Sequence, residues 1–187
     1  MRRTLYAAIA AAILLPASAL AQQSATPPAA VPPARPEDVA SIDAIIAATY
    51  DVISGPAGEK RNWDRFRSLF VPGARLIPTG KRPAERGGGF GHRVMTPEEY
   101  ITTSGAVLEE RGFFERELGR RVERYGNIAH VFSAYDSKAR QEDEKPFARG
   151  INSFQLHWDG SRWWVVSIFW AGETPENPIP ADMIGAR

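Results

Sequence analysis

The sequence predicts an α+β domain in which a curved antiparallel sheet wraps around helices that precede it in the chain. Two observations support this prediction. Segments with apolar residues at helical spacing fill the first half of the folded region, and long segments rich in β-forming residues fill the second half. Helices and strands segregated along a chain are typical of the α+β class. A sheet curved around helices would form a cone with a cavity inside.

The first helix is expected to begin at Pro36, because proline suits the first helical position and the next two residues are acidic. Apolar residues recur at helical spacing over 39–53, and Gly55-Pro56 ends the segment. A second, short helix fits residues 62–70, where Asn62 can act as the cap.

A turn at Pro72-Gly73 leads into a short strand over 74–79. The basic, glycine-rich segment 81–93 follows. Its glycines lack the spacing that cradles a phosphate, so we interpret it as a mobile surface loop, with a lid over a pocket as the alternative.

Thr96 and Glu99 form a capping box with proline between them, which predicts a helix that ends near Gly112. After this helix the pattern changes to that of long antiparallel strands. Asp159-Gly160 indicates a tight hairpin that joins the last two strands. The strands are expected within residues 114–124, 127–137, 147–158 and 161–170.

The chain of 187 residues divides into four parts by composition. Residues 1–21 have the form of a cleavable signal peptide: two arginines, a short apolar run, and small residues at Ala19 and Ala21. A membrane anchor is the alternative, but the apolar run is short for a span of about 30 Å. The expected parts are the signal peptide (1–21), a linker rich in Pro and Ala (22–35), the domain (36–174) and a Pro-rich surface tail (175–187).

Charge and composition exclude several kinds of function. Removal of Arg2 and Arg3 with the signal peptide leaves 21 basic and 22 acidic residues, so no clustered positive excess favours nucleic-acid binding. The three histidines are not at ligand spacing, and with no cysteine we expect neither a metal nor another cofactor. We expect a periplasmic or secreted protein that does not enter the membrane after cleavage.

The order of elements resembles the nuclear-transport-factor-2-like superfamily, in particular its SnoaL-like and ketosteroid-isomerase-like members and an exported bacterial subgroup of unassigned activity. The resembling segments are WDRFRSLFVPGARL, RYGNIAHVFSAY and DGSRWWVVSIFW. The resemblance implies a cone-shaped fold and covers about Val39 to Trp170. It implies no particular activity, because the acids, tyrosine and histidine used by the enzymes of the superfamily have no matching motif here.

Five residues are candidates for a site. His130 lies mid-strand and is a candidate general base, or a satisfied core histidine. Asn152 is either a ligand contact or a structural bridge, and Arg120 either lines the cavity mouth or forms cross-strand ion pairs. Ser167 and Trp170 belong to the last strand, whose two faces are both apolar, so that strand is expected to be a wall covered on both sides.

Three functions are compatible with this pattern. The first is a binding module whose cone holds a small, largely apolar molecule. The second is a lyase or isomerase in which His130 moves a proton and Asn152 or an arginine stabilises negative charge. The third is a homodimeric interaction module without a ligand, paired through the sheet face.

Overall fold

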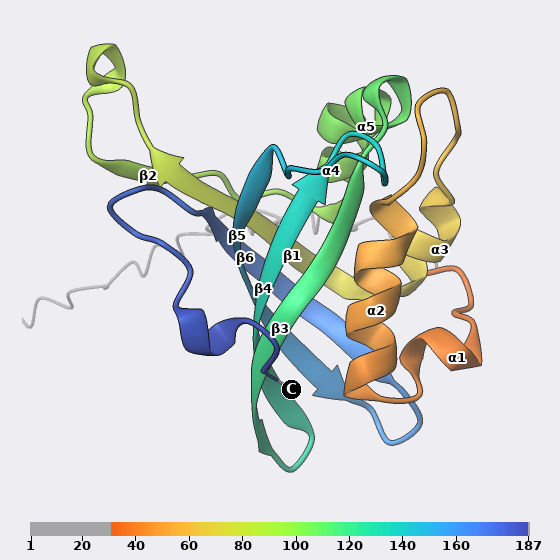
Figure 1. The fold of residues 1–187 in the computed structure, drawn as a ribbon. Coiled ribbons are helices and arrows are strands. Elements are labelled where there is room, and N and C mark those ends of the chain that lie inside the picture. The colour runs from red at the N-terminus through yellow and green to blue at the C-terminus, as the bar shows by residue number, and fades with distance from the viewer. Residues whose placement is uncertain (1–30, 187) are drawn as a thin grey trace, which may run out of the picture.

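The computed structural model describes residues 31–186 (Figure 1). The predicted signal peptide and most of the predicted linker lie outside these residues. No helix in the described part is long and apolar enough to span a bilayer. The described chain folds as one curved sheet with helices gathered on one of its faces (Figure 1).

Three helices precede the sheet: α1 (Pro36–Val39), α2 (Ile42–Ile53) and α3 (Trp63–Ser68). The sequence predicts a single helix in place of α1 and α2. The predicted helix is divided at Ser41, where the backbone is extended. The Ser41 side chain accepts a hydrogen bond from the Ala44 N–H at 3.0 Å. Serine is among the best helix caps, so α2 begins anew there. Asn62 caps α3 as predicted, accepting from the Arg65 N–H at 2.9 Å.

The predicted capping box is confirmed at the start of the next helical segment. The Thr96 side chain accepts from the Glu99 N–H, and the Glu99 carboxylate accepts from the Thr96 N–H. The segment runs through α4, a π-helical turn and α5, and ends before Gly112, whose φ of 75° suits glycine. Their bounds are Pro97–Tyr100, Ile101–Gly105 and Ala106–Arg111.

Six strands form the sheet in the order β2-β1-β6-β5-β4-β3. All neighbours are antiparallel except β1 and β6, which run parallel. The predicted α+β fold with a curved sheet is confirmed, and this one parallel pair is the addition. The strands are β1 (Phe70–Lys81), β2 (Phe90–His92), β3 (Phe114–Tyr125), β4 (Ile128–Lys138), β5 (Ala148–Trp158) and β6 (Trp163–Gly172).

The first strand is longer than predicted and extends into an arm. Pro72-Gly73 does not end it, because the register with β6 shifts between Phe70 and Arg75 and absorbs the irregularity as a bulge. The glycine-rich segment predicted as a loop contains a short 3₁₀ turn (Ala84–Arg86) and β2, which pairs back onto β1. The resulting hairpin projects away from the rest of the molecule (Figure 1).

Two further bulges change which side chains face the helices. The register of β3 with β4 shifts between Glu117 and Gly119, which makes Leu118 the extra residue. The register of β5 with β6 shifts between Gln155 and Leu156, which makes Val166 extra on β6. A one-residue shift moves every later side chain to the other face of a sheet, so simple alternation fails beyond both points.

The core lies between α2, α3 and the inner face of the sheet, the face turned toward these helices. Residues there are almost completely removed from solvent, and each contributes roughly 1.5–3 kcal/mol through burial. The largest include Ile45, Ile46, Phe66, Val131 and Phe154.

The proline-rich tail is held against the sheet at its end. Met183 is buried, the Gly185 N–H donates to the Leu118 carbonyl, and the Arg120 N–H donates to the Ala186 carbonyl, both at 2.8 Å. A side chain at Gly119 would collide with the backbone of the tail. Glycine and the bulge beside it therefore let the tail cover the free edge of β3.

Candidate functional site

Two cavities meet at the side chains of Tyr50 and Glu115. The outer cleft, between α2 and β3, has a volume of about 680 Å³. The inner cavity, inside the cone, has a volume of about 120 Å³ and is walled mainly by aromatic and aliphatic side chains. Tyr50 and Glu115 line both cavities, so these two residues lie at the boundary between the outer cleft and the inner cavity.

Glu115 is a partly buried carboxylic acid that has no ion pair among the described residues. The Ser137 hydroxyl donates to its Oε2 at 2.7 Å, and the Asn152 amide donates to its Oε1 at 3.4 Å. Burial raises the pKa of Glu115 to about 7, with a smaller contribution from the nearby Asp136, while the two hydrogen bonds act in the opposite direction. Glu115 can therefore hold or release a proton near neutral pH.

Glu117, two residues further along the same strand, is fully paired. The Arg120 guanidinium donates to its Oε2 from Nε at 2.9 Å and from Nη2 at 2.5 Å. The Arg120 side chain is only 5 % exposed and also contacts the exposed Asp43 carboxylate at 2.7 Å. The Ser133 hydroxyl donates to Glu117 Oε1 at 2.6 Å.

A chain of hydrogen bonds joins the two carboxyl groups. Because the Ser133 proton is used on Glu117, the Tyr50 hydroxyl donates to Ser133 Oγ, at 2.7 Å. The Asn152 amide donates to the Tyr50 oxygen at 3.1 Å and, with its second hydrogen, to Glu115. Burial raises the pKa of Tyr50, which keeps it protonated. The chain therefore fixes the orientation of Asn152 beside Glu115.

Two further tyrosines line the inner cavity without using their hydroxyl groups. Tyr100 and Tyr135 make no side-chain hydrogen bond within residues 31–186, and Tyr135 is only 6 % exposed. No completely buried side-chain oxygen or nitrogen in the described residues lacks a partner, so both hydroxyls reach open space. Burial, and then the charge of Glu115, raises the pKa of each. Both are therefore available hydrogen-bond donors.

Three of the five predicted site residues lie at these cavities. Asn152 faces inward and lines the inner cavity, where it acts as the bridge between Tyr50 and Glu115. Trp170 also lines the inner cavity, and Arg120 lines the outer cleft. Arg120 forms ion pairs, but not across strands as the alternative expects, because its partners are Glu117 on the same strand and Asp43 on α2.

His130 and Ser167 lie on the outer face of the sheet, away from the inner cavity. His130 neighbours inward-facing Val131 on β4, and its Nε2 contacts the Ser153 hydroxyl at 2.9 Å. Ser167 is paired with the exposed Gln155 beyond the bulge in β6. This placement removes the geometric basis for His130 as a base inside the cone.

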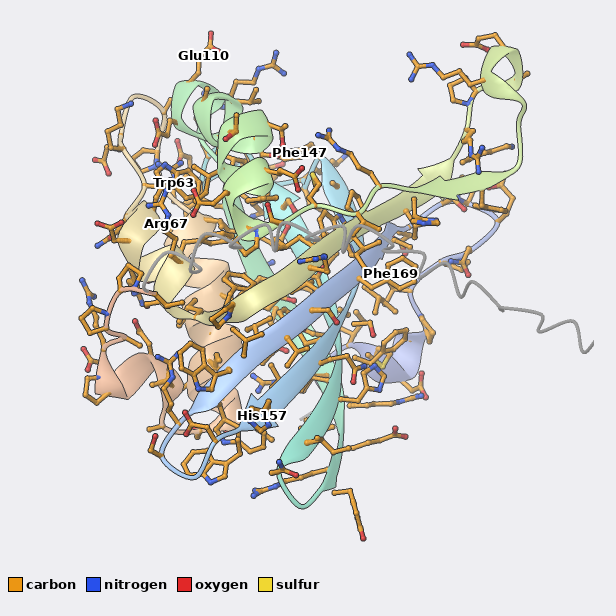
Figure 2. The ribbon with its side chains drawn as sticks, turned by 180° about the vertical axis from the view of Figure 1, so that it is seen from behind. Trp63, Arg67, Glu110, Phe147, His157 and Phe169 are labelled. Carbon is orange, nitrogen blue, oxygen red and sulfur yellow. The ribbon has the colours of Figure 1, made fainter. Side chains whose placement is uncertain are left out.

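Phe169, also on the outer face, is 46 % exposed (Figure 2). The tail residues Asn177–Pro180 line a cavity together with Phe169, so the described chain covers this face of the last strand in part. No group of three or more His, Asp or Glu side chains in residues 31–186 is arranged to hold a metal ion.

Comparison with known proteins identifies the architecture. No protein-family model matches the sequence, and a search of curated proteins found no significant match. Among solved structures, this chain is similar to a candidate dehydratase from the NTF2-like family of Streptomyces avermitilis, with a TM-score of 0.51 and 12% sequence identity. The match covers 77% of this chain and 97% of that chain. The fold is nuclear-transport-factor-2-like. A protein of unknown function with a cystatin-like fold from Nostoc punctiforme has a TM-score of 0.53 at 12% identity, covering 72% and 90% of the two chains.

Three residues of the candidate site, Tyr50, Glu115 and Glu117, are not among the candidates that the sequence indicates. Strict alternation along β3 would place Glu115 and Glu117 on the face opposite to that of Arg120. The bulge at Leu118 instead places all three on the inner face. The one sequence signal that could have found the site is the pair of acids in FERELG, spaced for one face of a strand.

Proposed function

We propose that this protein binds a small, largely apolar molecule that carries a hydrogen-bond acceptor oxygen, such as a carbonyl, in the inner cavity of the cone. The observation that carries this proposal is the pair of unused hydroxyls of Tyr100 and Tyr135 beside Glu115. Both hydroxyls reach open space and donate to no protein group, so a ligand oxygen can accept from them and gain affinity from these hydrogen bonds. The apolar walls favour an apolar ligand body, and the outer cleft offers room for the part that the inner cavity cannot hold.

The test is an NMR titration with cyclohexanone as the probe and cyclohexylammonium as the probe that lacks an acceptor. Saturable shifts of the Tyr100 and Tyr135 ring signals with cyclohexanone alone support the proposal. The Tyr100→Phe/Tyr135→Phe double variant should weaken binding by about tenfold or more, whereas Tyr125→Phe, at a site 84% exposed, should leave it unchanged. Absence of saturable binding, or equal binding by the double variant, would refute it.

A second candidate function is proton transfer at the same site, with Glu115 as the base. Its support is that Glu115 lines the cavity and has a pKa of about 7, which suits a general acid or base at neutral pH. Glu115 would take a proton from the carbon next to a carbonyl, and the tyrosine hydroxyls would stabilise the resulting enolate oxygen. The same first step precedes loss of water from a β-hydroxy ketone, and one protein of this fold is a candidate dehydratase.

Hydrogen–deuterium exchange tests this second candidate. Wild-type protein in D₂O should speed exchange at the α-carbons of cyclohexanone, and Glu115→Gln should remove the effect. His130→Ala, on the outer face, should exchange as fast as wild type. If cyclohexanone binds but its α-carbon hydrogens exchange no faster, the binding proposal stands and the proposed proton transfer is rejected.

Pairing of two copies through the outer face is a separate proposal. Its support is the exposure of two phenylalanines there, Phe132 at 39% and Phe169 at 46%. Large exposed apolar side chains that lie together are common at protein interfaces. Light scattering should give twice the monomer mass, and Phe169→Glu should return it to the monomer mass. A wild-type monomer at high concentration would reject pairing.

Export is also part of the proposal, and it depends on residues 1–21 alone. Mass spectrometry of protein from the periplasm or medium of its host should find a mature chain that begins at Gln22. An intact N-terminus on protein in the cytoplasm would reject it.

A further inference from the structure

A third cavity lies beside the start of α2, whereas the inner cavity is lined by residues of the second half of that helix. Figure 1 shows this end of α2 near α1 and the β5–β6 turn. The volume of the third cavity is about 440 Å³. It is lined by the start of α2, the guanidinium of Arg124 near the end of β3, and the indole rings of Trp158 and Trp163. We call it the basal pocket.

The indole N–H of Trp163 belongs to a buried side chain and donates to no protein group. Trp163 is 3% exposed, and its Nε1 makes no hydrogen bond within residues 31–186. Every completely buried side-chain nitrogen and oxygen in those residues has a partner, so this N–H must reach open space, and the basal pocket is the cavity that Trp163 lines. The ring packs beside Trp158, with 5.6 Å between the ring centroids, which holds it in place.

Arg124 adds a positive charge that forms no ion pair within residues 31–186. Its guanidinium carbon lies 5.1 Å from the centre of the Trp163 ring. Its Nε donates to the Gly126 carbonyl at 3.2 Å, and neither Nη atom contacts a carboxylate in the described residues. The one carboxylate in the pocket lining, that of Asp43, is 88% exposed to solvent and contacts Arg120 at 2.7 Å, a cation that it shares with Glu117.

The start of α2 supplies two more donors. The Ser41 hydroxyl oxygen accepts from the Ala44 N–H, and the Ser41 carbonyl accepts from the Ile45 N–H. The N–H groups of Ile42 and Asp43 have no partner in the described chain. At the positive end of a twelve-residue helix, such groups favour a negative ligand.

We propose that the basal pocket binds an anionic group of a small molecule, a carboxylate or a phosphate monoester, independently of the cone. The donors are the Trp163 indole, Arg124 and the start of α2. The aromatic pair gives the group that carries the anion an apolar surface to lie on.

The test follows the Trp163 indole N–H signal by NMR while sodium phosphate, phenyl phosphate or sodium acetate is added at constant ionic strength, with sodium chloride as the reference. Saturable shifts with phosphate or phenyl phosphate alone assign the phosphate class, and shifts with acetate alone assign the carboxylate class. Either result supports the proposal. No saturable shift, or the same shift with chloride, overturns it.

Variants separate the site from general charge attraction. Arg124→Gln should weaken binding by about tenfold or more, because a charge-assisted hydrogen bond is lost. Trp163→Phe keeps a ring but removes the N–H and should also weaken binding. Arg86→Gln removes an exposed arginine from the β1–β2 arm and should change nothing. Equal binding by Arg124→Gln and wild type, with both thermally stable, would reject the site.

Discussion

Glu115 and Glu117 lie two residues apart on the same face of the same strand, yet their surroundings are opposite. Glu117 is neutralised by the buried Arg120 and accepts from Ser133. Glu115 has only neutral donors, Ser137 and Asn152, and faces a cavity. The comparison shows how one strand can supply a structural ion pair and a titratable group. A buried carboxylate with a cation stays charged, and one without a cation keeps its proton to higher pH.

The largest effect is expected from breaking the structural pair. Arg120→Met should destabilise the protein by about 3–5 kcal/mol in urea unfolding, because the Glu117 charge stays buried without a partner. Arg121→Met is the matched control, since the neighbouring Arg121 forms an exposed pair with Asp182 and should cost less than about 1 kcal/mol. Equal losses for the two variants would show that Glu117 does not need its cation.

The next effect concerns the pH dependence of stability that Glu115 contributes. Its pKa rises from 4.5 in the unfolded chain to about 7 in the fold, so the folded state binds more protons between these values. Stability should therefore fall by about 3 kcal/mol as pH increases from 4.5 to above 7. Glu115→Gln should remove this fall, and Glu123→Gln, exposed on the same strand, should retain it. A pH slope that survives in Glu115→Gln would assign it to another group.

A smaller effect is expected from cutting the link between the two carboxyl groups. Tyr50→Phe removes the hydroxyl that accepts from Asn152 and donates to Ser133. The loss should be about 1–3 kcal/mol, because buried polar groups are left unpaired. Chemical denaturation measures it, with Tyr125→Phe as the control. A stability equal to that of wild type would mean that water replaces the hydroxyl.

The smallest effect is expected on the outer face. His130→Ala should change stability by less than about 0.5 kcal/mol, because the ring is partly exposed and its partner Ser153 can turn to water. The Glu115 titration should stay unchanged. A shift of that titration in His130→Ala would couple the two faces of the sheet and restore His130 as part of the site.

Local signals in the sequence predicted the helix caps and the order of elements well. Ser41 is the exception, since it was read as part of one continuous helix. The candidate site was predicted less well, because strand faces were assigned by alternation. The bulges at Leu118 and Val166 reverse that alternation. Beside Leu118 the tail, which is distant in the sequence, packs against Gly119, so no local pattern could reveal the inward turn of Arg120.

The difference between the two carboxyl groups is tested most directly by a carbon-detected NMR titration of glutamate side chains, with Glu115→Gln used to assign the Glu115 signal. The account predicts a midpoint near pH 7 for Glu115. A Glu115 midpoint near pH 4.5 would contradict it, because the carboxyl would then be as well solvated as a surface acid.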